Sequence, residues 1–438
     1  EHLYHRLLRR KSWQQRLAAI MLKEKKMSSQ EKPLDPEKER RKIKSVKKMK
    51  DIMTHYYIEA KTAGETGKKV AWITSGGPVE PLIAMDVIPV YPENHGAMIG
   101  ASKMGVDLCE KAEGMGYSGD LCTYALADIA CSPVDGGPIG GLPKPDMLVC
   151  CNNICGTVLK WYEVQARYYD VPLFILDTPF CHTEFSAEAQ QYVRRQLDEY
   201  LVFLETACGK TCDRDRLQEV GRLSMAGQRL WQAVLDTTVN KPAPMSAFDA
   251  FFHLALIVTL RGTQTVIDYY TELLAEMQTR VAEGISAVPD EKHRLLWDNL
   301  PIWYRTKWLS EKFASHKACL VADTYTSAWC GSLQYMNEDD FLGSMAEGYS
   351  RIYLNIGTDQ MAAMVLEMID KYAAEGLVMH SNRSCKPYSL GQYDIARIVQ
   401  EQRGLPTLII EANMTDARSF SESQVETRID AFMEMLKA

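Results

Sequence analysis

Short, continuous apolar runs, each followed by a polar turn and then by a helical pattern, recur along this chain. Four of them lie in its first half, at residues 69–75, 87–91, 146–151 and 171–178. A strand that is apolar on both faces must be covered on both faces, which is typical of a parallel sheet with crossover helices on either side. The first half therefore predicts a doubly wound α/β domain.

The same alternation resumes towards the carboxyl end, with apolar runs at residues 319–325, 376–381 and 405–413. Between the two series lies a long stretch with helical periodicity and few strand signals. We therefore expect an α/β fold with two doubly wound parallel-sheet domains, a helical insert and an N-terminal helical extension. The expected boundaries are 1–68 for the extension, 69–185 for the first α/β domain, 186–300 for the helical region and 301–438 for the second α/β domain.

The extension carries two distinct patterns. Residues 1–26 are strongly basic, whereas residues 36–62 form a charged helical pattern that leads into the first strand. A basic helix of this kind either binds a partner or stays solvated beside the body of the protein, and the solvated form is the ordinary one.

Composition excludes several classes of function. Charged residues make up 24% and hydrophobic residues 46% of the 438 positions, which is ordinary globular usage and allows more than one core. The net charge of −7 provides no basic field for nucleic acid. No run reaches the roughly 18 to 20 apolar residues of a membrane span, and none resembles a secretion signal. We expect a cytoplasmic protein that binds a small molecule or another protein.

Twelve cysteines are many for a chain expected in a reducing compartment, where disulfides are rare. Metal binding is therefore the natural question, although a free cysteine is most often a small buried apolar residue. We expect that ordinary role for most of the twelve. Its candidates include Cys150, Cys151, Cys208, Cys212, Cys319 and Cys330.

Three cysteines have a different context. Cys122 lies in YSGDLCTYA, Cys155 in CCNNICGTV and Cys385 in NRSCKP. The last two stand just beyond predicted strands, where loops of parallel sheets present ligands. Thiolates suit iron–sulfur clusters, but these three cysteines lack the compact spacing of a ferredoxin. Their spacing alone leaves cluster binding and core packing both open.

Ordered motifs extend the comparison beyond the cysteines, over most of residues 69–438. They are VAWITS, YPENHGA, YSGDLCTYA, PDMLVCCNNICGTVLKWYE, KPAPMSAFDAF, NRSCKP and TDARSFSESQVETRIDAFMEM. Together they resemble the 2-hydroxyacyl-CoA dehydratase and benzoyl-CoA reductase family. The segments around Cys155 and Cys385 are most similar to the larger, alpha, subunit of the dehydratases.

The resemblance implies a 4Fe-4S cluster held by Cys122, Cys155 and Cys385, with one iron left for the substrate, and a heterodimer with a related second subunit. It also implies a separate ATP-dependent iron–sulfur activator as electron donor. A separate activator agrees with a chain in which no P-loop or GxGxxG follows a strand. The implied reaction is an oxygen-sensitive, anaerobic dehydration of a 2-hydroxyacyl-CoA thioester to an enoyl-CoA through a one-electron ketyl radical.

Two further residues match family positions near the proposed cluster. Ser75 follows the first predicted strand and resembles a family serine that hydrogen-bonds near the thioester oxygen; its ordinary role would be a helix N-cap. Glu93 resembles a family acidic residue, and a buried carboxyl with a raised pKa suits proton transfer. Its ordinary role would be a solvated turn residue.

Other polar residues beside the cysteines are candidate substrate contacts. Asn152 and Asn153 are expected to donate amide hydrogen bonds, although asparagine is also common in turns after strands. Arg383 and Lys386 flank Cys385, and they either balance the charge of the cluster, reach the phosphates of CoA or form an exposed basic loop.

One segment departs from the dehydratase pattern. Dehydratase large subunits end the last strand with a GDQ-type turn before a DPR-like segment, whereas this chain has IEAN at 410–413 and TDAR at 415–418. The IE start resembles benzoyl-CoA reductase subunits, so ATP-driven ring reduction of an aryl-CoA is the alternative. A double-cubane cluster reductase and a non-catalytic electron-transfer subunit also stay open. The CNNIC segment around Cys155 favours the dehydratase.

Overall fold

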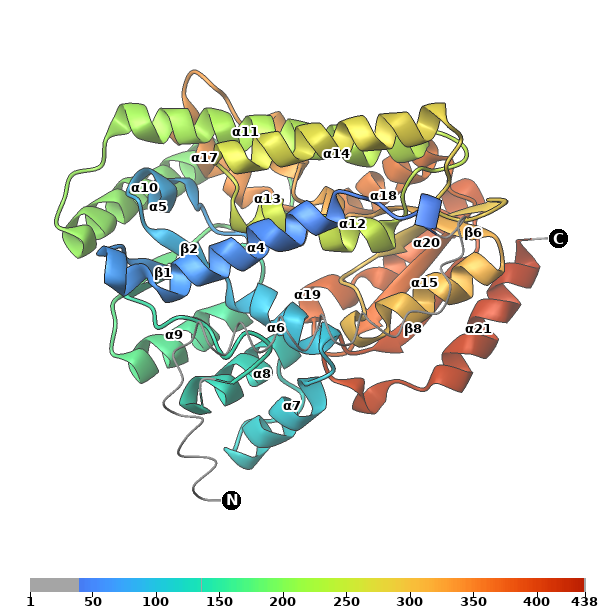
Figure 1. Cartoon of the computed structure of the whole chain (residues 1–438), viewed down its shortest axis with the longest axis horizontal. Helices are drawn as coiled ribbons and strands as arrows, with labels where there is room; N and C mark the ends of the chain where they lie inside the picture. Colours follow the sequence, from blue (N-terminus) through green and yellow to red (C-terminus); the bar gives the residue numbers. More distant parts are fainter. Residues whose placement is uncertain (1–38, 135, 437–438) are drawn as a thin grey trace. The chain divides into compact units, whose positions relative to one another are not determined.

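The computed structural model describes residues 39–134 and 136–436. The chain divides after Ile43, and the part that begins at Lys44 forms one compact unit. The basic stretch 1–26 lies outside the described residues. All elements named below belong to the unit that begins at Lys44 (Figure 1).

The described residues contain two four-stranded sheets, in which every neighbouring pair of strands is parallel. The first sheet has the order β2-β1-β3-β4 and consists of β1 (Val70–Ile73), β2 (Ile88–Val90), β3 (Met147–Cys151) and β4 (Leu173–Leu176). The second has the order β6-β5-β7-β8 and consists of β5 (His293–Asp298), β6 (Ala318–Asp323), β7 (Gly376–Asn382) and β8 (Thr407–Ala412). The predicted α/β fold with two parallel sheets is confirmed.

Five helices follow the strands of the first sheet, namely α5 (Glu80–Ala84), α6 (Pro92–Ala101), α7 (Gly105–Gly114), α8 (Thr123–Cys131) and α9 (Thr157–Tyr169). Strand β3 shows why both faces of this sheet are apolar. Cys150 packs in one cluster with Trp161 of α9, whereas its neighbour Cys151 packs in another cluster with Leu197. Successive strand residues point to opposite faces, so helices cover the sheet on both sides.

The region after β4 is helical, as expected, and comprises α10 (Ala187–Cys208), α11 (Arg214–Asp236), α12 (Ala247–His253), α13 (Ala255–Thr259) and α14 (Gln264–Ala282). Its helices begin at side-chain caps: Ser186 for α10, Asp213 for α11, and Ser246 in a capping box with Asp249 for α12. Helices α11 and α14 lie side by side along one edge of the molecule (Figure 1). Helix α4 (Val46–Lys61) is tied to β2 by a 2.7 Å hydrogen bond from the Tyr56 hydroxyl to the carbonyl of Pro89.

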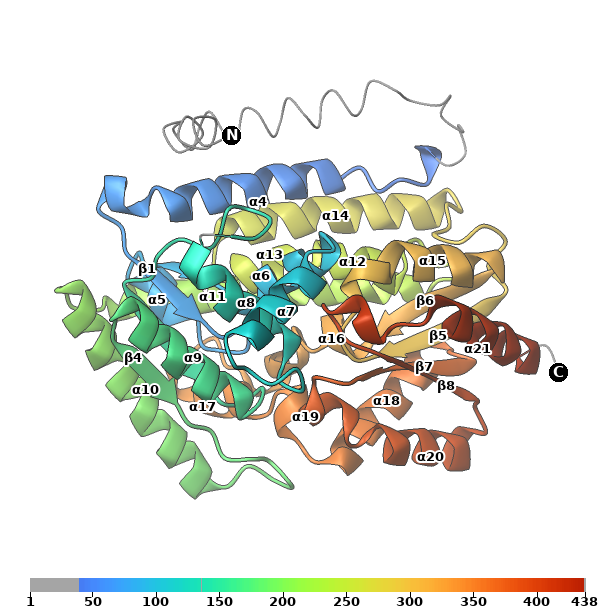
Figure 2. The same cartoon turned by 90° about the horizontal axis from the view of Figure 1, so that it is seen from below.

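The second sheet is also covered on both sides, by α15 on one face and by α18 and α20 on the other (Figure 2). The helices of this half are α15 (Thr306–Ser315), α16 (Thr324–Ser327), α17 (Phe341–Ser350), α18 (Thr358–Tyr372), α19 (Lys386–Ser389), α20 (Gln392–Arg403) and α21 (Glu422–Met435). Short 3₁₀ segments are η1 (Ala63–Thr66), η2 (Ser132–Val134), η3 (Thr237–Val239), η4 (Trp303–Arg305), η5 (Gly331–Tyr335), η6 (Tyr353–Asn355) and η7 (Ala417–Ser419).

Strand β5 is a central strand that the sequence pattern did not predict, because it lies in the region 186–300 that reads as helical. Its sequence, HRLLWD, begins with a histidine and an arginine, so the apolar run is confined to residues 295–297. Arg294 is nevertheless buried, and its guanidinium donates to the carbonyls of Tyr372 at 2.9 Å and Thr238 at 2.6 Å and pairs with Glu291 at 2.7 Å. These partners offset the cost of burying the charge.

Candidate active site

The three candidate cysteines occupy equivalent local positions, each immediately before or two residues before a helix. Cys122 is the N-cap of α8, Cys155 lies between β3 and α9, and Cys385 is the N-cap of α19 after β7. In each case the first turn of the following helix presents backbone N–H groups to the sulfur. The donors are Tyr124 and Ala125 for Cys122, Thr157 and Val158 for Cys155, and Tyr388 for Cys385. Such donors stabilise a thiolate, which is the form that binds metal.

These cysteines come from three separate segments that meet. The hydroxyl of Thr123, next to Cys122, lies 3.2 Å from the hydroxyl of Ser384, next to Cys385. Burial, together with the smaller effect of the neighbouring Cys155, raises the pKa of Cys122 to about 12. Burial also raises the pKa of Cys385, and both other thiols add to that effect. The thiols are therefore close enough to influence one another, and metal binding would have to displace their protons.

The donor set suits a cluster better than a single ion. Among residues 39–134 and 136–436, no group of three or more His, Cys, Asp or Glu side chains converges to hold one metal ion. A cubane cluster binds one cysteine at each iron, so its thiolates surround a volume and do not meet at a point. Three half-buried cysteines on different segments fit that requirement.

Glu93 and Ser75 lie together beside this group of cysteines. The backbone N–H of Ser75 donates to Oε1 of Glu93 at 3.1 Å, and the hydroxyl of Tyr162 donates to Oε2 at 3.1 Å. Glu93 is buried in the first turn of α6, and burial raises its pKa to about 7. Its charge acts on both Cys122 and Cys155. The carboxyl is thus placed to exchange a proton near neutral pH.

Ser75 does not cap a helix. Helix α5 begins at Glu80, its N-cap is Val79, and Ser75 lies in the turn between β1 and that helix. The ordinary role considered for Ser75, a helix N-cap, is therefore not the role it has in this structure.

The two asparagines have different surroundings. Asn152 Oδ1 accepts from the N–H and the hydroxyl of Thr178, at 2.7 and 2.8 Å, and its amide donates to Asp177, so this side chain joins the ends of β3 and β4. Asn153 is buried, and its amide donates to the carbonyls of Gly76 at 2.8 Å and Tyr349 at 2.7 Å. Asn153 therefore contacts the turn that carries Ser75.

The basic residues after β7 lie at the surface. Arg383 pairs with Glu411 at 2.9 Å, and both side chains are more than half exposed. Lys386 donates to the carbonyl of Arg383 at 2.6 Å, and its charge reaches the Cys385 thiol. Of the two, Lys386 is the one placed to act on the proposed cluster.

Tyr162 is the contact that sequence reasoning missed. It stands seven residues after Cys155 on the face of α9 that also buries Val158 and Trp161. The period of that buried face was readable in the sequence, but the distant Glu93 that accepts its hydroxyl hydrogen was not.

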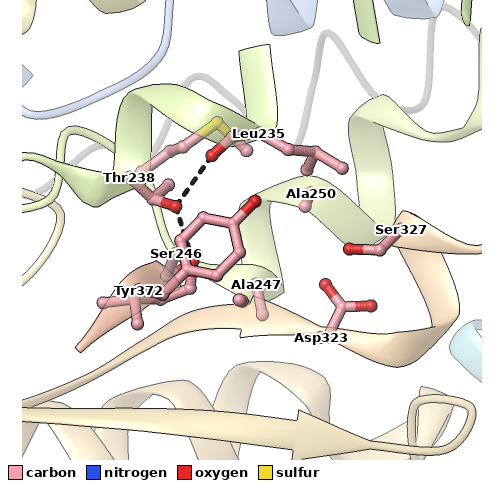
Figure 3. Close-up of a pocket in the computed structure, with 11 residues that line it drawn as sticks. Leu235, Thr238, Ser246, Ala247, Ala250, Asp323, Ser327 and Tyr372 are labelled. Atoms are coloured by element: carbon pink, nitrogen blue, oxygen red, sulfur yellow. Dashed lines mark hydrogen bonds between the residues drawn. The ribbon is translucent and has the colours of Figure 1, made fainter. Parts of the chain in front are cut away.

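A small cavity lies where β6 meets the helical region (Figure 3). Its volume is about 10 Å³, and its lining includes Thr238, Ala247, Asp323 and Tyr372. That volume holds about one water molecule. An acyl-CoA thioester does not fit there. Separately, no helix in the described part of the chain is both long and apolar enough to cross a membrane.

The fold and the residues at the strand ends place the chain in a known class. Residues 74–436 match the model of the 2-hydroxyglutaryl-CoA dehydratase, D-component family, and the chain belongs to that family. The family predicted from the motifs is thereby confirmed.

Particular relatives refine this assignment. The chain is 34% identical to the (R)-2-hydroxyisocaproyl-CoA dehydratase alpha subunit of Clostridioides difficile, over 88% of this chain and 95% of the relative. It is 33% identical to the (R)-phenyllactyl-CoA dehydratase alpha subunit of Clostridium sporogenes, over 92% and 98%. A benzoyl-CoA reductase subunit of Thauera aromatica is 28% identical, over 90% and 94%. The dehydratase relatives are thus the more similar of these three.

Proposed function

We propose that this chain is the alpha-type subunit of a 2-hydroxyacyl-CoA dehydratase that converts its substrate to an enoyl-CoA. The observation that carries the proposal is that Cys122, Cys155 and Cys385, from three separate segments, lie near one another and near the contact between Ser75 and Glu93. The relatives named as dehydratase alpha subunits support it over nearly their whole length.

The three thiolates would hold a 4Fe-4S cluster. When bound, that cluster supplies a single electron, delivered by an ATP-dependent activator, and an iron free of cysteine for the substrate thioester. Asn153 holds the turn that carries Ser75, and Lys386 offsets negative charge at Cys385. Asn152 and Arg383 also flank the cysteines and would contact the CoA portion; Arg383 is more than half exposed and so is open to a ligand from solvent.

Ser75 and Glu93 would have different roles towards the substrate, hydrogen bonding for Ser75 and proton transfer for Glu93. The Ser75 hydroxyl donates to the thioester oxygen and orients the acyl group. Glu93, about half protonated near pH 7, gives its proton to the departing hydroxyl at carbon 2, which leaves as water. The proton lost from carbon 3 restores the carboxyl. Tyr162 keeps the Glu93 side chain oriented throughout.

Anaerobic co-expression with a related second subunit and an ATP-dependent activator tests this proposal. Iron and sulfide are counted first, and the complex is then offered a panel of 2-hydroxyacyl-CoA thioesters, with products identified by mass spectrometry. We expect loss of water from at least one thioester, with dependence on ATP and on the second subunit. Turnover by the isolated chain would contradict the proposal, as would complete inactivity of the iron-loaded complex.

Ring reduction of an aryl-CoA is the second candidate. It is supported by the benzoyl-CoA reductase relative and by Ile410–Glu411 at the end of β8. Benzoyl-CoA in the same panel separates the two reactions, because reduction adds hydrogen to the acyl group whereas dehydration removes water. An iron count near eight per chain would instead indicate a double-cubane cluster. A cluster whose spectrum ignores every thioester would indicate an electron-transfer subunit.

A further inference from the structure

The turn that carries Ser75 is packed without spare room. A Cβ on Gly76 would lie 2.7 Å from Cγ2 of Ile154, and a Cβ on Gly77 would lie 2.9 Å from Cγ1 of Ile73. Ile154 is the neighbour of Cys155. We call residues 152–156, between β3 and α9, the cysteine loop, because they include Cys155. Close contact along the turn fixes the position of Ser75 relative to this loop. A small shift of the turn would therefore move Ser75 relative to Cys155.

Two buried side chains hold the carbonyls of this turn. Asn153 donates to the carbonyl of Gly76 at 2.8 Å, and Nη2 of Arg261 donates to the carbonyl of Gly77 at 3.2 Å. They reach the turn from distant parts of the sequence: Asn153 follows β3, and Arg261 follows α13.

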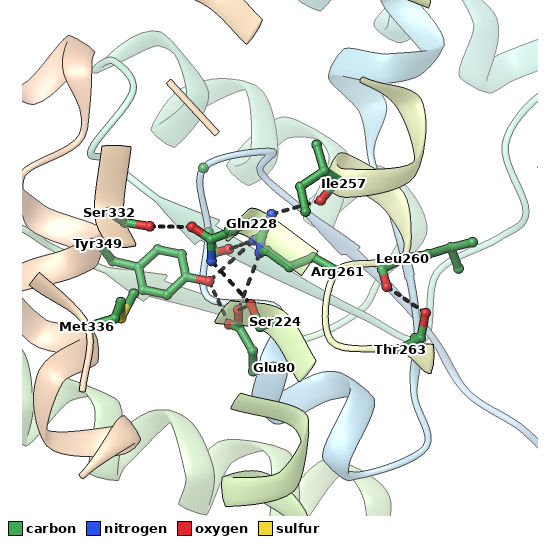
Figure 4. A network of polar contacts seen from close by, with 12 residues as sticks. Glu80, Ser224, Gln228, Ile257, Leu260, Arg261, Thr263, Ser332, Met336 and Tyr349 are labelled. Carbon is green, nitrogen blue, oxygen red and sulfur yellow. Dashed lines mark hydrogen bonds and ion pairs between the residues drawn. The ribbon is translucent and has the colours of Figure 1, made fainter. Parts of the chain in front are cut away.

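Tyr349, near the end of α17, joins these two contacts (Figure 4). Its carbonyl accepts from Asn153 at 2.7 Å, and its hydroxyl accepts from Nη2 of Arg261 at 3.3 Å. The same hydroxyl donates to Oε2 of Glu80 at 2.5 Å, and Oε1 of Glu80 pairs with Nε of Arg261 at 3.3 Å. Ser224 donates to that Oε1 at 2.6 Å.

All of these groups are buried: Arg261 is 4% and Glu80 0% exposed. A buried ion pair is a weak source of stability, because desolvation cancels most of the attraction, but its fully bonded geometry fixes neighbouring atoms. The guanidinium also lies over the ring of Trp329, 5.5 Å from its centre, which limits its motion. The network thus supplies rigidity at the turn.

We propose that Tyr349, acting with Arg261 and Glu80, is a positioning residue that holds the Ser75 turn against the cysteine loop for catalysis. This inference rests on the proposed function for its kinetic consequences. It also has a consequence for the turn itself, which is measurable without substrate.

The test compares Tyr349→Phe with Tyr270→Phe. Tyr270 is a matched control, because it is also buried and its hydroxyl donates to the carbonyl of His253 at 2.8 Å and accepts from the N–H of Ile257 at 3.0 Å. Both substitutions remove one buried hydroxyl that makes structural hydrogen bonds, so both should lower the melting temperature. Only Tyr349→Phe should raise hydrogen–deuterium exchange in a peptide covering residues 70–79. Equal exchange in this peptide for the two variants would overturn the proposal.

The kinetic arm uses the loaded complex. Tyr349→Phe should lower kcat by about tenfold with unchanged iron content and little change in KM, because small misplacement of a reacting group is costly. Combined with Ser75→Ala, it should add less than about a further twofold, since both changes act through Ser75. The proposal would be overturned if the two substitutions lowered kcat independently, so that their fold-changes multiplied in the double variant. It would also be overturned if Tyr349→Phe had the same kcat as Tyr270→Phe.

Two safeguards keep the result interpretable. If Tyr349→Phe does not fold, Arg261→Lys keeps the charge but loses the planar donor to Gly77, and the same exchange and kinetic changes are expected. If the wild-type complex transforms no thioester, the proposed function fails, while the exchange measurement still decides whether Tyr349 holds the turn.

Discussion

The two parallel sheets differ in what the polar residues at the carboxyl ends of their strands contact. At the carboxyl ends of β1, β2 and β3, the first sheet presents Ser75, Glu93 and Cys155 towards one site. The second sheet contributes Cys385 after β7, but the polar residues that end β5 and β6 are saturated by local partners. Asp298 accepts from Gln392, Thr324 and Tyr353, and Asp323 accepts from the N–H and the hydroxyl of Thr326.

Glu93 in the first half of the chain and Asp323 at the end of β6 show this difference between the sheets for two carboxyls with similar pKa values. Burial raises the pKa of each to about 7. Asp323 is the N-cap of α16, whereas Glu93 accepts from Ser75 and Tyr162 beside the cysteines. A raised pKa therefore does not identify a functional carboxyl by itself; the groups around it decide what the proton is used for.

The largest expected effect concerns the cysteines. Cys122→Ala, Cys155→Ala and Cys385→Ala should each remove most of the roughly four irons per chain and abolish turnover, because each removes one cluster ligand. Cys208→Ala and Cys212→Ala should keep the iron, since both residues lie in the helical region at the end of α10 and just after it. Iron and sulfide analysis after anaerobic purification measures this. Full iron content in all three variants would show that these cysteines are not the cluster ligands, and the first sheet would then have no special site to compare with the second.

Next in size is the exchange of Glu93 for glutamine. Loss of a general acid should lower turnover by about a hundredfold to ten-thousandfold. In the wild type, the rate should fall as pH rises above about 7, because Glu93 ionises and no longer donates. Glu93→Gln should lack that limb of the pH profile, and Asp323→Asn should keep it. A limb that disappears with Asp323 and not with Glu93 would reverse the roles assigned to the two carboxyls.

Ser75→Ala should lower turnover by roughly tenfold to a thousandfold, within the range for preorganised donors to a developing oxyanion. Iron content and melting temperature should hardly change, because Ser75 caps no helix. Ser186→Ala is the matched control: Ser186 caps α10 by accepting from the N–H of Ala189 at 3.2 Å, so its loss should cost about 1 kcal/mol of stability and leave turnover intact. If the two variants behave alike, Ser75 has only a structural role.

The smallest effect concerns the second sheet alone. The folded protein binds a proton at Asp323 up to about pH 7, whereas the unfolded chain releases it near pH 4. The free energy of unfolding should therefore fall as pH rises between these values, with a slope of up to about one proton. Asp323→Asn removes that contribution, and urea unfolding at several pH values measures it. An unchanged slope would show that Asp323 is ionised throughout.

The sequence predicted the elements of both sheets wherever an apolar run marked them. It missed β5 because the strand begins with His293 and Arg294, which leaves a short apolar run, and Arg294 is tolerated in the core through its ion pair with Glu291 and the carbonyls it reaches. Motifs brought Cys122, Cys155 and Cys385 together as candidates. Tyr162 and Tyr349 could not be found in the same way. Each is important because of a hydrogen bond to a residue far away in the sequence, Glu93 for Tyr162 and Glu80 for Tyr349.

The distribution of the three cysteines over the chain also has a consequence for synthesis. Cys122 and Cys155 belong to the half that leaves the ribosome first, and Cys385 follows only after the whole helical region and three strands of the second sheet. At about 5 to 20 residues per second, the first two thiols wait on the order of ten seconds or more for the third. If the three cysteines hold the proposed cluster, its loading would follow translation, and until then the nascent half would carry two thiols that need protection from oxidation.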